Sequence, residues 1–197
     1  HLIVTFPFLL LLSLNVYKDY GISIDEESTR INGLVSLNYI CEFFFPEREF
    51  NFQLVNNIPD LNTYPFREYG VLFEIILILI VEVFLGVKEF SEIFYLRHLL
   101  TNFLFLVSLI FFYFISTKIF NNKYFPFLSL IILCTSPRIF AESFYNDKDI
   151  VFLSFFIFTI FFSIKFLKNI NYQNAFMLSL FSAFLINIRV IGIYMVI

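Results

Sequence analysis

The chain has 197 residues, of which 59% are hydrophobic and only 15% are charged, and its mean hydropathy is +0.83. An ordinary soluble domain carries about 25% charged residues, so this chain has too few polar side chains to cover a globular surface in water. The formal net charge of −3, without a basic run, excludes nucleic acid as an expected partner. Two cysteines are too few for a disulfide framework or a zinc site.

Apolar stretches long enough to cross a bilayer recur along the chain. A transmembrane helix needs about 20 apolar residues, and in chain order the candidate spans are 2–17, 71–87, 99–116, 150–167 and 175–197. The apolar stretch 124–134 is too short to cross, so we expect a re-entrant or interfacial helix there. The sequence therefore predicts an all-α fold, a polytopic transmembrane helical bundle forming one membrane domain.

The two ends of the sequence point to a longer protein. The chain begins with His1 and ends at Ile197 inside an apolar run. The first apolar stretch lacks the basic start and the cleavage site of a signal peptide. We expect a chain truncated at both ends, the N-terminal part of a membrane domain.

Two polar segments, 18–69 and 136–149, interrupt the apolar pattern. Basic residues follow or flank two of the turns between expected spans: Lys88, Arg97 and His98 at one, Lys165 and Lys168 at the other. Cytoplasmic turns carry an excess of Lys and Arg. Placing both turns in the cytoplasm puts the outer loop 18–69 and segment 136–149 together on the extracytoplasmic face.

The outer loop opens with a run of acids. Asp25 and Glu26 follow the first expected span, and Arg30 lies close to one helical face with Asp25. A carboxylate with a nearby cation is a candidate general base or metal ligand. The alternative is a capped, solvated helix start, where acids favour the first turn.

Three further glutamates flank or enter the second expected span. Glu68 precedes the span, on the same face as Asp25, and is either an ordinary polar flank or part of a site. Glu74 and Glu82 lie inside the span, where a charged side chain costs at least about 2.5–3.5 kcal/mol. They should face protein or a water-filled cavity, paired with basic residues where these are within reach.

The second polar segment holds Arg138 and the run Asn146-Asp147-Lys148-Asp149. Asp149 starts the fourth expected span, where an acid also suits the positive helix N-terminus. Arg189 lies toward the outer end of the last expected span, where it either meets an anion or extends to the interface.

These residues together resemble the N-terminal part of a GT-C membrane glycosyltransferase, of the protein O-mannosyltransferase and aminoarabinose-transferase type. The resemblance rests on Asp25-Glu26 with Arg30 after the first helix, Glu68 before the second, and Ser136-Pro-Arg138 with Asn146-Asp-Lys-Asp149 before a later helix. It covers nearly the whole chain with short motifs.

The resemblance implies roles for individual residues. Asp25, with Glu26 beside it, matches the catalytic base, and Asp149 matches the second outer-loop acid, with Asp147 as the alternative. Glu68 falls where some members bind a divalent metal, although Tyr69-Gly70 replaces the usual Lys/His-Pro-Pro here. Residues assigned to substrate binding are Arg30, Arg138, Asp147, Lys148 and Arg189.

The implied activity is an inverting transfer of a sugar from a polyprenyl-phosphate carrier to a protein, lipid or glycan acceptor. Asp25 would deprotonate the acceptor, and arginine or a metal would stabilise the departing phosphate. A transporter or flippase-like protein that uses Glu74, Glu82 and Arg189 is the main alternative. A structural membrane subunit is a third, but it leaves the loop acids unexplained.

Overall fold

The computed structural model describes residues 2–46, 58–122 and 124–195, and this part of the chain contains helices and no strand. The prediction of an all-α fold is therefore confirmed. In chain order the helices are α1 (Leu2–Val16), α2 (Ile24–Phe44), α3 (Leu72–Ile78), the π-helix η1 (Leu79–Phe84), α4 (Phe90–Ile119), α5 (Phe125–Thr135), α6 (Pro137–Tyr145), α7 (Asp149–Lys168), α8 (Tyr172–Ile188) and the 3₁₀-helix η2 (Val190–Met195).

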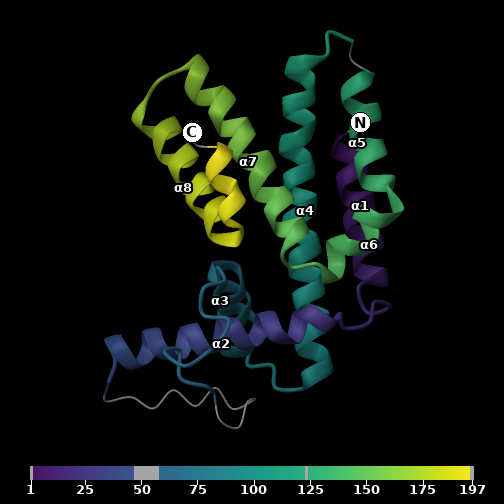
Figure 1. Ribbon diagram of the computed structural model, residues 1–197. Helices are drawn as coiled ribbons and strands as arrows, with labels where there is room; N and C mark the ends of the chain where they lie inside the picture. The colour runs from purple at the N-terminus through teal and green to yellow at the C-terminus, as the bar shows by residue number, and fades with distance from the viewer. Residues whose placement is uncertain (1, 47–57, 123, 196–197) are drawn as a thin grey trace.

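Helices α4 and α7 form the centre of an upright bundle (Figure 1). With 30 and 20 residues, they are the two described helices that are long and apolar enough to cross a membrane. They contain the expected spans 99–116 and 150–167. The described part of the chain thus has two helices long and apolar enough to cross, or three candidate crossings if α5 and α6 together form one broken span.

Helices α5 and α6 are bent by 62° at the break between them. Pro126 lies in the first turn of α5 and Pro137 in the first turn of α6, where the missing N–H of proline costs no helical hydrogen bond. The pair is either a broken span or a re-entrant loop, and the sequence predicted a re-entrant or interfacial helix over the α5 stretch.

The remaining expected spans form shorter helices. Helix α1 has 15 residues and α8 has 17, below the roughly 18 residues that mark a spanning helix by length. The last two residues of the expected span 175–197, and part of the outer loop, 47–57, lie outside the described residues. Crossings by α1 and α8 stay predictions.

Phenylalanine rings fill the interface between α7 and α8. Phe155 stacks on Phe184 with ring centroids 4.8 Å apart, and Phe162 stacks on Phe181 at 5.0 Å. Phe155, Phe181 and Phe184 belong to the apolar cluster that also includes Leu185, which is fully buried. Offset and stacked aromatic pairs add to the area they bury, so α8 is fixed against α7 along its length.

Helix α2 lies across one end of the bundle rather than along it (Figure 1). It packs on α3 at Gly33, where an added Cβ would come within 2.7 Å of the Glu74 Cβ and 2.8 Å of Ile78 Cδ1. The absent side chain lets the two backbones approach closely. The sequence predicted a small folded outer loop here, but not a 21-residue helix.

Segment 71–87, where the sequence predicted a crossing, forms the 7-residue α3 and the 6-residue η1. After η1 the chain turns at Gly86, whose φ of 65° is available to glycine at little cost. The following helix starts beside the outer loop, because Lys18 Nζ lies 3.3 Å from Glu92 Oε1. Neither α3 nor η1 is among the described helices long enough to cross a membrane, and a crossing by 71–87 stays a prediction.

The turn containing Lys88, Arg97 and His98 was expected on the face opposite the outer loop, and that expectation is wrong. Instead, His98 Nε2 lies 2.7 Å from Glu26 Oε1 in α2, and Arg97 forms an ion pair with Asp147 in segment 136–149. The charge pattern misled because Arg97 and His98 contact buried acids inside the bundle and do not flank a membrane surface.

Candidate functional site

Helix α2 begins with a carboxylate that is turned inward. Ser23 is the N-cap residue, and its backbone N–H donates to Glu26 Oε2 at 2.6 Å, as in a capping box. The other oxygen of Glu26 contacts His98 Nε2, and both side chains are almost fully buried. Glu26 therefore joins α2 to α4.

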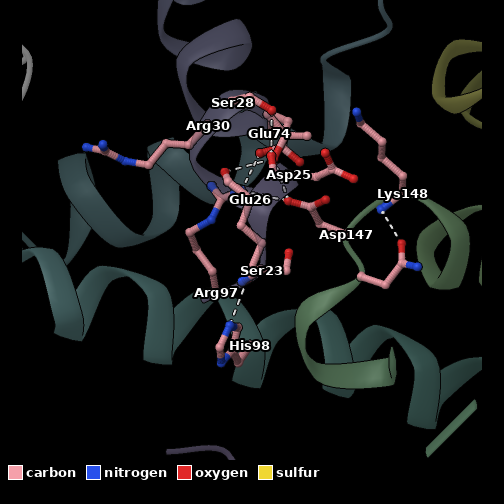
Figure 2. A network of polar contacts seen from close by, with 12 residues as sticks. Ser23, Asp25, Glu26, Ser28, Arg30, Glu74, Arg97, His98, Asp147 and Lys148 are labelled. Atoms are coloured by element: carbon pink, nitrogen blue, oxygen red, sulfur yellow. Dashed lines mark hydrogen bonds and ion pairs between the residues drawn. The ribbon is translucent and has the colours of Figure 1, made fainter. Parts of the chain in front are cut away.

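A second buried group joins α3 and α4 to the α6–α7 turn. The Arg97 guanidinium forms ion pairs with Glu74 and, at 3.1 Å, with Asp147, while Thr29 Oγ1 donates to Asp147 at 2.7 Å. Arg97, Glu74 and Asp147 are all buried. Figure 2 shows this network with Asp25 and Lys148 beside it.

Asp147 is the acid whose chemistry this environment changes most. Burial, together with the negative charge of Glu74, raises the pKa of Asp147 to about 8, and the charge of Arg97 only partly opposes this. Two carboxylates share one arginine, so one of them tends to hold a proton. Asp147 is thus suited to holding a proton near neutral pH.

Arg30 forms a separate buried ion pair with Glu82. Its Nε and Nη2 atoms donate to the two carboxylate oxygens at 2.7 and 2.8 Å. This bidentate geometry is the strongest form of the arginine–carboxylate contact. Figure 2 shows Arg30 extending away from Asp25 and Lys148, and Glu82 has the basic partner that the sequence led us to expect.

An open cleft lies next to this network, between α2, the end of α8 and segment 65–70. It has a volume of about 730 Å³, and its charged lining residues are Asp25, Glu68, Lys148 and Arg189. A neighbouring hollow of about 150 Å³ shares Asp25, Lys148 and Arg189 and adds Asp147 and Asp149. We call these two hollows together the cleft.

The carboxylates of the cleft differ from those of the network. Among the described residues, the side chains of Asp25 and Glu68 make no hydrogen bond or ion pair, and both are exposed. Arg189 pairs with Asp149, with both side chains about half exposed. Unpaired acids beside exposed cations leave the cleft free to bind both hydroxyl groups and anions.

Segment 58–71 is held against the cleft by specific contacts. The backbone N–H of Leu72 donates to Asn187 Oδ1 at 3.0 Å, and the Tyr64 hydroxyl donates to Asn32 Oδ1 at 2.5 Å. A Cβ at Gly70 would overlap the Asn187 carbonyl. Lys148 Nζ lies 5.2 Å from the centroid of the Tyr69 ring, within cation–π range.

A small cavity connects the cleft to the buried network. It has about 20 Å³ of space and is lined by Thr29, Tyr69, Glu74, Asp147 and Lys148, among others. This is room for about one water molecule, which needs roughly 10–15 Å³. Asp147 lines both this cavity and the cleft, so the buried network reaches the cleft at this residue.

The predicted site residues divide into two groups. The structure brings together six of them around the cleft: Asp25, Glu68, Asp147, Lys148, Asp149 and Arg189. It places Glu26, Arg30 and Arg138 elsewhere. The first two are buried in ion pairs, and Arg138 is an exposed residue paired with Glu142 one helical turn away at 2.7 Å. Direct roles for these three in catalysis or substrate binding do not fit their positions.

The expected metal role of Glu68 finds no support in the described part of the chain. No three His, Cys, Asp or Glu side chains there come close enough to hold a metal ion. Glu68 shares the larger hollow of the cleft with one other acid, Asp25, and with cationic, aromatic and aliphatic residues such as Lys148 and Tyr69. Glu68 is better suited to accepting hydrogen bonds.

Three residues that matter in the structure were not predicted as part of it. Arg97 and His98 were interpreted as membrane-flanking residues, and Asn187 was not considered. A signal for the first two existed, since charged side chains inside an apolar helix require buried partners, and Glu74 was an available acid. The contact of Asn187 with Leu72 depends on tertiary packing alone.

Comparisons with known proteins do not assign this chain to a family: no family model, no curated protein and no solved structure matches it.

Proposed function

We propose that this chain contains the donor and acceptor site of a membrane glycosyltransferase that uses a polyprenyl-phosphate-linked sugar. The observation that carries the proposal is the cleft, in which an exposed, unpaired Asp25 lies with the cations Lys148 and Arg189 at the end of apolar helices. A lipid-linked donor stays in the bilayer, so a site at helix ends suits it.

The chemistry follows from the charges. The acceptor hydroxyl oxygen forms a bond to the anomeric carbon while the bond from that carbon to the phosphate oxygen breaks, and its electron pair leaves with the polyprenyl phosphate. Asp25 takes the hydroxyl proton as general base. Lys148 and Arg189 stabilise the charge on the departing phosphate, for which Arg189 exchanges Asp149 for the phosphate.

We place the cleft on the extracytoplasmic face. Lysines gather at the opposite end of the bundle, where Lys118 Nζ and Lys165 Nζ lie 4.8 and 5.4 Å from the same Phe161 ring, with Lys168 at the end of α7. Cytoplasmic ends of spans carry the excess of Lys and Arg, so this end faces the cytoplasm.

The transporter alternative has less support. Glu74 and Glu82 each pair with a buried arginine, and Arg189 pairs with Asp149. Among the described contacts these three residues do not touch one another. They therefore do not outline a continuous polar path across the bundle.

The test is a transfer assay on the full-length protein in membranes, supplied with a panel of radiolabelled polyprenyl-phosphate sugars. We expect Asp25→Asn to lower transfer by about 10²–10⁴-fold, the usual contribution of a general base. Glu27→Gln is the matched control, because Glu27 is also exposed on α2 but does not line the cleft. Transfer by Asp25→Asn at the wild-type rate would refute the base assignment, and no transfer of any donor would refute the proposed function.

A further inference from the structure

One wall of the cleft combines two exposed aromatic rings with a free carboxylate. Phe66 and Tyr69 are 48% and 58% exposed, with ring centroids 6.1 Å apart. Glu68 lies between them in the sequence and lines the same cleft. We call Phe66, Glu68 and Tyr69 the aromatic wall. The two rings form an exposed apolar surface beside the polar lining of the cleft, which a ligand with an apolar face can cover.

The aromatic wall is fixed in place rather than loosely attached. Tyr64, which packs edge-on against Phe66 at 5.8 Å, is anchored to α2 through Asn32. On the other side, Gly70 and Leu72 are held against Asn187 at the end of α8. A site built on a positioned backbone binds at a lower entropic cost than a mobile loop does.

The chemistry of the wall selects among ligands. A hydrocarbon chain would cover the rings, but it would also remove water from the Glu68 and Asp25 carboxylates without giving them hydrogen bonds, which is costly. A free anion can bind the nearby cations, but at the wall itself it would meet the negative charge of Glu68. A sugar ring satisfies both kinds of group, because its C–H face packs on aromatic rings while its hydroxyls donate to carboxylates.

The neighbouring cations determine where the phosphate of the ligand lies. Lys148 Nζ lies over the Tyr69 ring, 5.2 Å from its centroid, and Arg189 lines the same cleft. A sugar packed on Tyr69 therefore has a cation directly beside it. A sugar that carries a phosphate on its anomeric carbon needs such a cation to bind the phosphate.

We infer that the aromatic wall binds the sugar ring of the phosphate-linked donor, with Tyr69 packing on its C–H face and Glu68 accepting its hydroxyls. This inference rests on the proposed function and deepens it. Glu68 then determines sugar specificity and is not a metal ligand. The prenyl chain lies outside this wall.

The test measures binding without transfer, on the full-length protein in detergent. The probes are farnesyl phosphate and a farnesyl-phosphate-linked hexose, with saturation-transfer NMR on the ring C–H protons and a Kd for each probe. We expect Tyr69→Ala and Glu68→Gln to weaken binding of the sugar-bearing probe by about fivefold to tenfold. Binding of bare farnesyl phosphate should not change, and Tyr69→Phe should retain the ring-proton signal.

Two matched controls isolate the wall. Tyr172→Ala removes an exposed tyrosine at the start of α8, and Glu27→Gln removes an exposed acid on α2; neither residue lines the cleft. Both should bind the two probes as the wild type does. Equal loss for both probes in Tyr69→Ala, or no loss in both Tyr69→Ala and Glu68→Gln, overturns the sugar assignment while leaving the proposed function intact. A wild type that binds neither probe overturns the proposed function with it.

Discussion

Two groups of charged side chains meet at the α2 end of the bundle, one buried and one open. In the buried network, Glu26, Glu74 and Glu82 each contact a basic residue, and their side chains are nearly inaccessible. In the cleft, Asp25 and Glu68 are exposed and unpaired.

This difference distinguishes acids that stabilise the fold from acids that are available to bind a ligand, although all of them lie close together. A buried charge must be paired to be tolerated, so its removal should first be felt as a loss of stability. An exposed unpaired charge contributes little to folding and remains available to a ligand. Asp147 belongs to both groups, because it pairs with Arg97 and also borders the cleft.

Among the substitutions, the largest effect on stability should come from Arg97→Met. This change leaves Glu74 and Asp147 buried beside each other without their shared cation. Breaking a buried pair from one side typically costs about 3–5 kcal/mol. Thermal unfolding in detergent would measure it, and an unchanged midpoint would mean that the network does not hold α3, α4 and the α6–α7 turn together.

Gly33→Ala should cost about 1–3 kcal/mol, as other overpacked sites do. The new methyl group would lie 2.7 Å from the Glu74 Cβ and force α2 away from α3. Gly21→Ala is the matched control, since nothing lies within 4 Å of a Cβ there. Equal stability of the two variants would show that α2 can shift without consequence.

Stability should fall as the pH rises from about 4 to about 8. The pKa of Asp147 is raised from 3.8 to about 8 by burial and by Glu74, so the folded protein holds a proton that the unfolded chain releases in this range. The slope is at most about 1.4 kcal/mol per pH unit for one proton. Unfolding midpoints across this range should show it, and Asp147→Asn should remove it; a slope that survives in this variant would assign the proton to another group.

The smallest effect should come from Arg138→Met, which is also the control for Arg97→Met. Arg138 is 86% exposed and pairs with Glu142 on the same helix, and such pairs contribute about 0.3–0.5 kcal/mol. The same unfolding assay should barely detect the change. A loss of stability as large as that of Arg97→Met would show that buried and exposed ion pairs do not differ in their contribution to the fold.

Much of the fold could be predicted from the sequence, because hydropathy alone identifies α4 and α7. The proximity of segments 18–69 and 136–149 was predicted from the positions of Lys and Arg, and Thr29 does donate to Asp147 across them, although Arg97 and His98 do not lie where that argument placed them. The division of 71–87 into α3 and the π-helix η1 could not be predicted, since the stretch is apolar enough for one continuous helix. Hydropathy does not show where a helix changes its hydrogen-bonding pattern.

The sequence predicted which residues lie near the candidate site. It did not predict which of them are buried in ion pairs and which line the cleft. Charge type and position placed Asp25, Asp149 and Arg189 in one group, and the structure gathers them around the cleft. The sequence did not show that Glu26 and Arg30 turn inward while Asp25 remains exposed. The sequence alone does not show which of two neighbouring acids on a helix is buried, because burial depends on helices that are far away in the chain.

The contact between Thr29 and Asp147 also has a consequence for biosynthesis. Ribosomes deliver the chain from its N-terminus, so α2 emerges before Glu82, His98 and Asp147, its later partners. During that interval Glu26 and Arg30 have no buried partners, so α2 cannot yet take its place in the bundle. Only after α4 and the start of α7 have emerged can α2 dock and the cleft take shape, which makes cleft formation a late step in the maturation of this protein.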